Sequence, residues 1–331
     1  MPTNVTAEYK AAEAAYKKAR DPGERLSLLK DMLRLIPKHK GTDHVQADIK
    51  SKIKELTDEL TGPKKGAARG GPPTVIRPDG AAQIALIGPP NSGKSALHAV
   101  LTGSHAVSEP FPFATQYPQP GMMPFEDIAF QLVDLPSLSP EHPIPWIGNA
   151  LHPADAAWLV VDLDAPDCIE GVAVGLDMLA ERRVHLTTGA AVENEDDPFA
   201  VYIPTLLVVT KADLLADPDA EIDAFLDLCG LPFDAAAVSA ATGSGLKALG
   251  STMFERLEVI RVYTKIPGLA PDMTRPFTLL GTGTVGDVAA LVHKDIAKSL
   301  KFARVWDAEY QGRQVGKDHP VADGDVLELH D

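Results

Sequence analysis

Residues 88–95 read Gly-Pro-Pro-Asn-Ser-Gly-Lys-Ser and lie between a short apolar run and an apolar helical pattern. The run Ala82–Ile87 predicts a buried strand, and Ser95–Leu101 predicts a helix. A glycine, four residues, a second glycine, a lysine and a hydroxyl residue form the Walker A pattern, whose backbone N–H groups close around phosphates. A chance match in a turn rich in glycine and proline is the alternative, but the flanking strand and helix argue against it. The pattern therefore predicts a P-loop in a doubly wound α/β domain.

This loop predicts the phosphate contacts of a bound nucleotide. Lys94 is expected to bridge the β- and γ-phosphate oxygens, and the Ser95 hydroxyl is expected to ligate Mg²⁺. The helix that follows adds the positive end of its dipole. The residues that we assign to nucleotide binding here are Gly88, Pro89, Pro90, Asn91, Ser92, Gly93, Lys94, Ser95 and Ala96.

A second motif indicates which base is bound. Thr210-Lys211-Ala212-Asp213 follows the apolar strand Leu206–Val209 and stands in for Asn-Lys-x-Asp, with Thr210 as a variant first residue. The Asp213 carboxylate can accept hydrogen bonds from both N1–H and the exocyclic amine of guanine, whereas adenine offers neither arrangement. Each mispaired buried polar group costs about 1–3 kcal/mol. The loop Ser239-Ala240-Ala241, after the next strand, is expected to contact the guanine O6 through its backbone amides.

Two residues between these motifs are candidates to sense the γ-phosphate. Asp134 ends the apolar strand Ile128–Val133 and fits a carboxylate that holds Mg²⁺ through water. Thr115 follows Phe111–Ala114 and fits the switch hydroxyl that closes on Mg²⁺, although a loop threonine without a role is the alternative. We predict catalytic roles for Lys94 and Thr115.

Hydrophobic periodicity and the positions of glycine and proline divide the chain into four predicted segments. We predict a helical arm over 1–61, with a helical hairpin, a flexible basic linker over 62–80, a nucleotide-binding domain over 81–259 and a small α+β domain over 260–331. The last domain has one predicted helix, Val285–Lys298. The predicted central strands are Gln83–Ile87, Ile128–Val133, Ala157–Val161, Leu206–Val209 and Ala236–Val238.

Charge is distributed unevenly along the chain. The net charge is −15, yet residues 1–72 carry 15 Lys and Arg against 10 Asp and Glu, while residues 73–257 carry 7 against 25. A basic arm permits contact with RNA without requiring it, because lysine-rich helices commonly just solvate a surface. The sequence has no signal-peptide pattern and no apolar run of about 18 residues, so we expect a cytoplasmic protein without a membrane partner.

Several motifs resemble the Obg–DRG family of GTPases, and its DRG branch in particular. Phe111–Thr115, followed by Pro118 and Gly121, is similar to that family's first switch, and Asp134-Leu135-Pro136-Ser137-Leu138 is similar to its second. The C-terminal segments that resemble a TGS domain, a β-grasp fold, are Tyr263–Lys265, Leu291–Ile296, Ala303–Trp306 and Val315–His319. The resemblance implies a GTPase associated with translation, binding GTP or GDP with Mg²⁺ and contacting the ribosome, RNA or a protein cofactor through the TGS domain and the arm.

Departures from the family pattern bear on catalysis. Ser137 replaces a glycine whose N–H binds the γ-phosphate; Ser137 keeps that N–H and stays in our nucleotide-binding set. Leu138 stands where many GTPases carry a glutamine that orients water. We therefore expect slow hydrolysis of GTP to GDP and phosphate, about 10⁻³ s⁻¹ or below. Asn91 either helps to hold a K⁺ ion beside the phosphates or only fits the backbone of the turn.

Two functions remain open from the sequence. The preferred one is a slow, Mg²⁺-dependent GTPase switch that works with the ribosome or RNA. The other is a pseudo-GTPase scaffold, in which the nucleotide is a structural ligand and the TGS domain is the binding module. Asp213 disfavours an ATPase.

Overall fold

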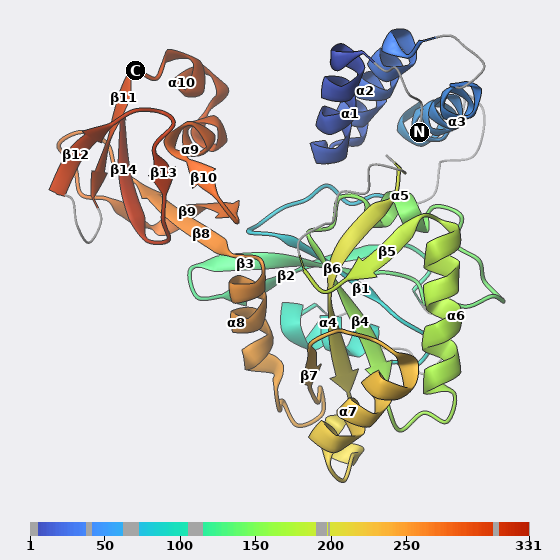
Figure 1. Cartoon of the computed structure of the whole chain (residues 1–331). Coiled ribbons are helices and arrows are strands. Elements are labelled where there is room, and N and C mark those ends of the chain that lie inside the picture. Colours follow the sequence, from blue (N-terminus) through green and yellow to red (C-terminus); the bar gives the residue numbers. More distant parts are fainter. Residues whose placement is uncertain are drawn as a thin grey trace.

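The computed structural model describes residues 6–37, 42–61, 73–104, 115–189, 197, 199–306 and 311–330. It consists of an arm (α1–α3), a central domain (β1–α8) built on a seven-stranded sheet, and a C-terminal domain (β8–β14) built on a second sheet (Figure 1). Residues 62–72 of the predicted linker lie outside the described residues. Within the described ranges, no helix is long and apolar enough to cross a membrane.

The described residues of the arm form three helices, one more than the predicted helical hairpin has. They are α1 (Ala7–Lys18), α2 (Pro22–Leu35) and α3 (Asp43–Thr61). The Asp21 carboxylate accepts hydrogen bonds from the first N–H groups of α2, as an N-cap does. Tyr16, Leu29 and Ile49 fill the space between the helices, and Phe199 of the central domain joins the same cluster. The arm therefore shares its core with the central domain.

The central sheet is mostly parallel. Its order is β2-β3-β1-β4-β6-β5, and β7 pairs with β6 as well. Among the strands that the structure describes in this sheet, only β2 and β3 pair antiparallel; the other pairs are parallel. Burial is complete along β1 and β4, as expected for strands covered on both faces. The strands are β1 (Gln83–Ile87), β2 (Gln119–Phe125), β3 (Ile128–Asp134), β4 (Ala156–Asp162), β5 (Val184–Thr187), β6 (Val201–Thr210) and β7 (Ala235–Ala237).

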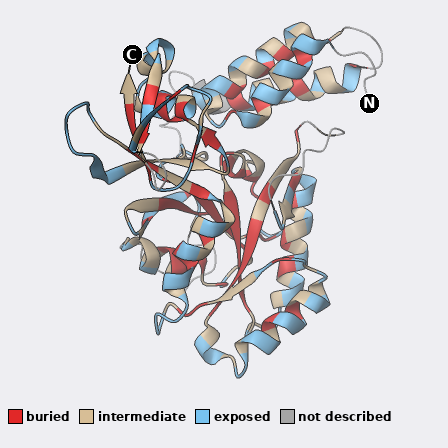
Figure 2. Cartoon of the chain, turned by 60° about the vertical axis from the view of Figure 1, so that its left-hand side comes forward, coloured by how far each residue is buried: buried red, intermediate tan, exposed pale blue. Residues whose placement is uncertain are grey.

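Helices cover both faces of this sheet. The core on one face includes residues of α5, α6 and α7, among them Leu179 and Phe225, and the core on the other face includes Leu97 of α4 and Leu249 of α8. The buried residues follow the strands through the centre of the domain (Figure 2). Full burial of each large apolar side chain contributes about 1.5–3 kcal/mol. The helices are α4 (Lys94–Thr102), α5 (Ile147–Leu151), α6 (Cys168–Glu181), α7 (Pro218–Cys229), α8 (Leu246–Arg256) and the short 3₁₀ helix η1 (Ala212–Leu214).

The C-terminal domain has a sheet of order β12-β11-β14-β8-β9 and a two-stranded pair, β10 with β13. Its predicted single helix is wrong: His293 is extended (φ −166°, ψ 137°) and separates α9 from α10. Val285 and Val288 of α9 are fully buried in the core of this domain. The elements are β8 (Val259–Thr264), β9 (Asp272–Leu280), β10 (Gly283–Thr284), α9 (Val285–Val292), α10 (Lys294–Ser299), β11 (Phe302–Trp306), β12 (Gln311–Val315), β13 (Pro320–Val321) and β14 (Asp325–His330).

Candidate functional site

The phosphate loop connects β1 to α4 at the carboxyl end of the parallel strands. Gly88 has φ 151°, and a Cβ on it would lie 2.2 Å from the carbonyl oxygen of Val160, so no larger residue fits there. Gly93 has φ 85° and precedes α4 without a side-chain cap. The first N–H groups of α4 therefore lie next to the loop with no capping side chain, as in a phosphate-binding helix N-terminus. Asn91 adopts the left-handed region as well, with φ 58°.

Lys94 lies beneath this loop. Its Nζ donates to the carbonyl oxygens of Gly88 at 3.1 Å and Pro89 at 2.8 Å, and to the hydroxyls of Ser92 and Ser137, both at 3.2 Å. Only 4% of Lys94 is exposed. Burial lowers the pKa of its ammonium group to about 8, against the opposing effect of the Asp134 charge. Lys94 thus connects the phosphate loop to the second predicted switch.

Three predicted Mg²⁺ ligands meet beside Lys94. The Ser95 hydroxyl donates to Asp134 Oδ2 at 2.7 Å, and the Thr115 hydroxyl donates to the same oxygen at 3.1 Å. The Ser95 and Thr115 hydroxyl oxygens are 3.1 Å apart. Asp134 Oδ1 is buried without a hydrogen-bond partner among the described residues. Phe111–Ala114, the rest of the predicted first switch, lie outside the described residues.

The predicted base-binding loops follow β6 and β7. The Thr210 hydroxyl donates to the carbonyl oxygen of Ser92 at 2.7 Å, which ties the first loop to the phosphate loop. Asp213 lies exposed in η1. The backbone N–H of Ala212 donates to Val238 O at 3.1 Å, so the loop that begins at Ser239 lies beside it. Ala240 and Ala241 follow the buried Ser239.

Sequence reasoning missed Asp162. It ends β4, and its Oδ2 forms an ion pair with Lys211 Nζ at 2.5 Å. The backbone of Lys211 lies in the left-handed region, with φ 54°. A signal was present, since a carboxylate at the end of an apolar strand of a parallel sheet lies at the edge where such sites form.

Leu138 lies in the core of the central domain. Only 3% of it is exposed, and its Cδ1 would be 3.3 Å from a Cβ on Gly175 of α6. Its backbone N–H donates to Gly88 O at 3.0 Å. The backbone at this position therefore contacts the phosphate loop, while the side chain faces away from solvent.

Comparison with known proteins agrees with this geometry. Residues 83–211 match the sequence model of a family described as 50S ribosome-binding GTPase, and residues 260–331 match that of the TGS domain. The fold and the site thus define a GTPase of the P-loop class with a C-terminal TGS domain.

The similarity to curated relatives extends over most of the chain. The chain is 26% identical to an uncharacterized GTP-binding protein of Methanocaldococcus jannaschii over 92% of both chains. It is 24% identical to developmentally-regulated G-protein 1 of Arabidopsis thaliana, over 92% of this chain and 90% of the relative. The chain is 25% identical to GTP-binding protein 1 of Schizosaccharomyces pombe, over 92% of this chain and 98% of the relative. The chain is therefore a GTP-binding protein that is similar over most of its length to the DRG proteins, the developmentally regulated GTP-binding proteins.

Proposed function

We propose that this protein is a Mg²⁺-dependent switch that hydrolyses GTP slowly. The observation that carries the proposal is the convergence of the Ser95, Thr115 and Asp134 oxygens. These residues come from the start of α4, the segment before β2 and the end of β3, so one ligand at this point would contact both switch segments. Such a contact is how a γ-phosphate and its metal order switch segments.

The donor set fits Mg²⁺, which prefers hydroxyl and carboxylate oxygens. Ser95 and Thr115 would ligate the ion directly. Asp134, whose Oδ1 has no hydrogen-bond partner among the described residues, would hold it through water. When bound, the ion supplies positive charge that stabilises the phosphate oxygens. Lys94, now bound to loop carbonyls, would transfer its hydrogen bonds to the β- and γ-phosphates.

Asp213 would select guanine. Its exposed carboxylate is free to accept from N1–H and the amine, and Lys211 would cover the base while paired with Asp162. The Asp213→Asn variant should shift preference from guanine toward xanthine nucleotides, because the amide presents a donor to the xanthine O2. An unchanged preference, measured by competition between GDP and XDP, would contradict this role.

We propose slow hydrolysis because Leu138 places no polar group at the site and its side chain is held in the core. Backbone groups would orient the water, and Lys94, Mg²⁺ and a K⁺ ion held by Asn91 would supply the charge. Burial of Leu138 equally favours the second candidate, a scaffold that binds GTP without hydrolysing it.

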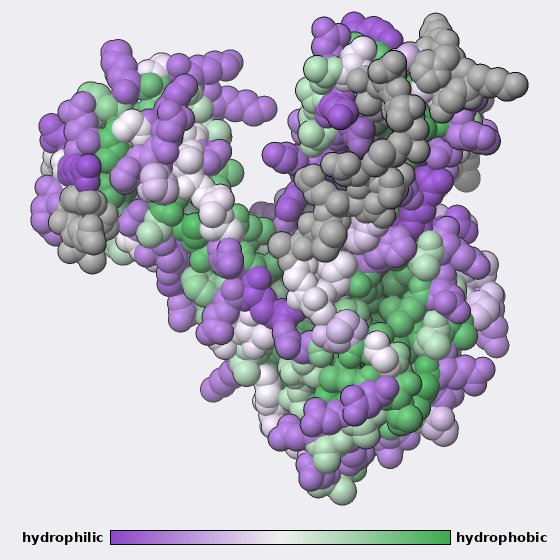
Figure 3. Space-filling view, in the orientation of Figure 1, coloured by the Kyte–Doolittle hydropathy of each residue, from purple (hydrophilic) through white to green (hydrophobic). Residues whose placement is uncertain are grey.

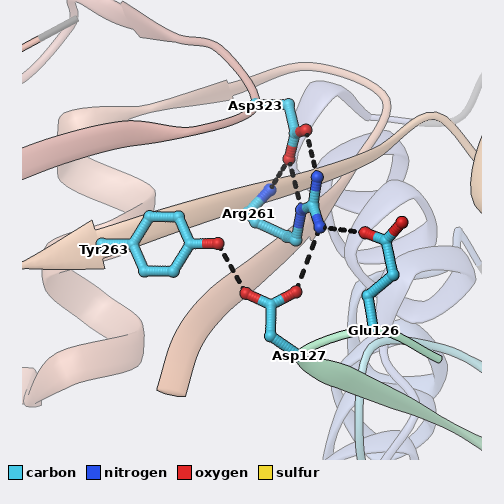
Figure 4. A network of polar contacts seen from close by, with 5 residues as sticks. All are labelled: Glu126, Asp127, Arg261, Tyr263 and Asp323. Carbon is cyan, nitrogen blue, oxygen red and sulfur yellow. Dashed lines mark hydrogen bonds and ion pairs between the residues drawn. The ribbon is translucent and has the colours of Figure 1, made fainter. Parts of the chain in front are cut away.

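The β2–β3 hairpin would carry the switch signal to the C-terminal domain, because residues at its turn contact residues of that domain (Figure 4). This hairpin begins just after Thr115 and ends at Asp134. At its turn, Asp127 accepts hydrogen bonds from Arg261 Nη1 at 3.0 Å and from the Tyr263 hydroxyl at 2.5 Å. Arg261 also binds both carboxylate oxygens of Asp323, at 2.8 Å and 3.0 Å, within its own domain. A shift of the hairpin would therefore move β8, the strand that contains Arg261 and Tyr263.

The partner that we propose is the ribosome or RNA, reached through the C-terminal domain and the arm, which would place the protein in the cytoplasm. Support comes from the ribosome-binding description of the matched family and from the basic arm, whose visible surface is mostly hydrophilic (Figure 3). Ribosome co-sedimentation with GDP, a GTP analogue and no nucleotide tests this. Association should depend on the nucleotide and weaken steeply with salt. Equal sedimentation in all three states would contradict a switch.

A further inference from the structure

A cavity of about 230 Å³ lies between the arm and the central domain. Its lining includes residues of α2 and α3 on one side, and of α5 and the segments that precede β5 and β6 on the other. Figure 1 shows the arm over this end of the central domain. The phosphate loop lies at the carboxyl ends of the parallel strands, so the cavity, near their amino ends, is a separate site.

Arg25 of α2 is the most buried cation in this cavity, with 4% exposed. Its Nη2 donates to the Tyr16 hydroxyl at 2.6 Å, and its guanidinium carbon lies 4.9 Å from the centre of that ring. Its Nε is buried and has no hydrogen-bond partner among the described residues. A buried guanidinium N–H without an acceptor is costly, so an acceptor is expected at this point.

Lys52 of α3 lines the same cavity. Its Nζ lies 5.2 Å from the centre of the Phe199 ring. In the part of the chain that the structure describes, no carboxylate lies within 4.0 Å of a charged nitrogen of Lys52 or Arg25. Burial, followed by repulsion from Arg25, lowers the pKa of Lys52. The two cations thus repel each other, and the more weakly acting charges of Glu55 and Asp197 offset this repulsion only in part.

His152, at the end of α5, adds a third nitrogen. Its Nδ1 is buried and has no hydrogen-bond partner among the described residues. Burial, and then the charges of Arg25 and Lys52, hold the pKa of its ring well below the usual range. An anion within reach of all three side chains would offset this repulsion and would accept a hydrogen bond from His152 Nδ1 once that nitrogen carries a proton.

The acidic residues at the cavity do not fill this role. Asp48 pairs with Arg183, at 3.2 Å between Oδ2 and Nη2. Glu55 accepts a hydrogen bond from the Ser51 hydroxyl at 3.4 Å and acts on Lys52 more weakly than Arg25 does. Glu181 is exposed. The centre of the cavity therefore keeps an excess of positive charge.

We propose that Arg25, Lys52 and His152 form a binding site for a phosphate-class oxyanion, which fastens the arm to the central domain. A guanidinium, an ammonium and an imidazole N–H are the donors that phosphate oxygens accept from. The ligand is either a free phosphate ion or a phosphodiester of RNA. Arg25 and Lys52 are on the arm and His152 is on the central domain. Binding of one anion to all three would therefore stabilise the contact between the arm and the central domain.

Titration of inorganic phosphate into the full chain, saturated with GDP and Mg²⁺ to block the phosphate loop, tests this site. Binding is read by calorimetry and by ³¹P NMR. We expect saturable binding by the wild type and a loss of affinity of about tenfold or more in Lys52→Gln and Arg25→Gln. Circular dichroism checks that each variant folds. If Arg25→Gln does not fold, the affinity of Lys52→Gln for phosphate alone decides the test.

The matched controls lie on the same helices. Lys50 of α3 and Arg34 of α2 are exposed, so Lys50→Gln and Arg34→Gln remove the same charges outside the cavity. They should bind phosphate as the wild type does. No binding by the GDP-saturated wild type, or an equal loss in the control variants, would overturn the proposal.

A short single-stranded RNA without a terminal phosphate distinguishes the two sources. If its binding weakens in Lys52→Gln but not in Lys50→Gln, the site takes a phosphodiester. If only inorganic phosphate responds to Lys52→Gln, the ligand is the free ion.

Discussion

Arg261, in the first strand of the C-terminal domain, binds Asp127 in the β2–β3 turn of the central domain, with 3.0 Å between Nη1 and Oδ1. Burial opposes ionisation of Asp127, but hydrogen bonds from Tyr263 and Arg261 hold its pKa below the usual range. The hydrogen bond that the Tyr263 hydroxyl donates to Asp127 raises the pKa of Tyr263 to about 12. Arg261 and Asp127 therefore both stay ionised at neutral pH, and their ion pair joins the domain that binds nucleotide to the TGS domain.

Arg261→Ala should weaken this contact between the two domains. The side chain is 18% exposed and binds three carboxylates, so we expect a loss of about 1–3 kcal/mol in the free energy of unfolding. Hydrogen exchange in β8 should rise, and its difference between GDP and a GTP analogue should disappear, while GDP affinity stays the same. Arg275→Ala, an exposed arginine of β9, is the matched control. Unchanged exchange in Arg261→Ala would contradict the role of the hairpin.

Nucleotide binding should take up a proton at alkaline pH. The pKa of Lys94 is about 8 in this structure, because the ammonium group is buried, and bound phosphates would raise it. Between about pH 8 and the raised value, the free protein binds fewer protons than the complex. GDP affinity should therefore fall as pH rises above about 8, by at most about tenfold per pH unit.

Calorimetry at pH 9 in two buffers of different ionisation enthalpy measures this uptake directly. Near pH 7, where Lys94 is mostly protonated in both states, the uptake should be small. Equal proton uptake at the two pH values would show that the Lys94 charge does not change on binding.

Leu138→Gln should not create a fast GTPase. The side chain is buried against α6, so the amide would be left without partners or displaced, at a cost of about 2–4 kcal/mol in the free energy of unfolding. We expect the hydrolysis rate to change by less than about tenfold. Leu138→Met keeps the volume and should cost less than about 1.5 kcal/mol. A large rate increase in Leu138→Gln would show that this side chain reaches the γ-phosphate.

Turnover should be faster in KCl than in NaCl at matched ionic strength if Asn91 holds K⁺, as we propose. Its φ of 58° also suits asparagine in a turn, so the variant must keep the backbone. Asn91→Gly does so, and should lose the difference between the two salts without losing GDP binding. Equal wild-type turnover in both salts would leave Asn91 only its role in the turn.

The places of most candidate site residues in the fold could be predicted, because these residues follow buried strands at fixed spacing. The phosphate loop, Asp134 and Thr210–Asp213 each come directly after an apolar run. The strand β1 ends where its run ends, and β3 and β6 end one residue later. Local pattern alone is enough for such residues.

The strands β2 and β5, which are not predicted from the sequence, lack such a pattern. β2 contains Pro120, Gly121 and Pro124 and is half-exposed, so it forms only because β3 offers it a partner at the edge of the sheet. β5 has only four residues. Arg261 and Asp127 are polar and separated by 134 positions, and no local signal connects them.

Single-turnover phosphate release from GTP tests the central claim most directly. The wild type should release phosphate with a rate on the order of 10⁻³ s⁻¹ or below in Mg²⁺, and EDTA or Ser95→Ala should slow it further, because Ser95 supplies a metal ligand. The rate of phosphate release by Lys94→Ala is the background that is subtracted. If the wild type releases no more phosphate than Lys94→Ala, with or without ribosomes, the protein is a nucleotide-binding scaffold and not a GTPase.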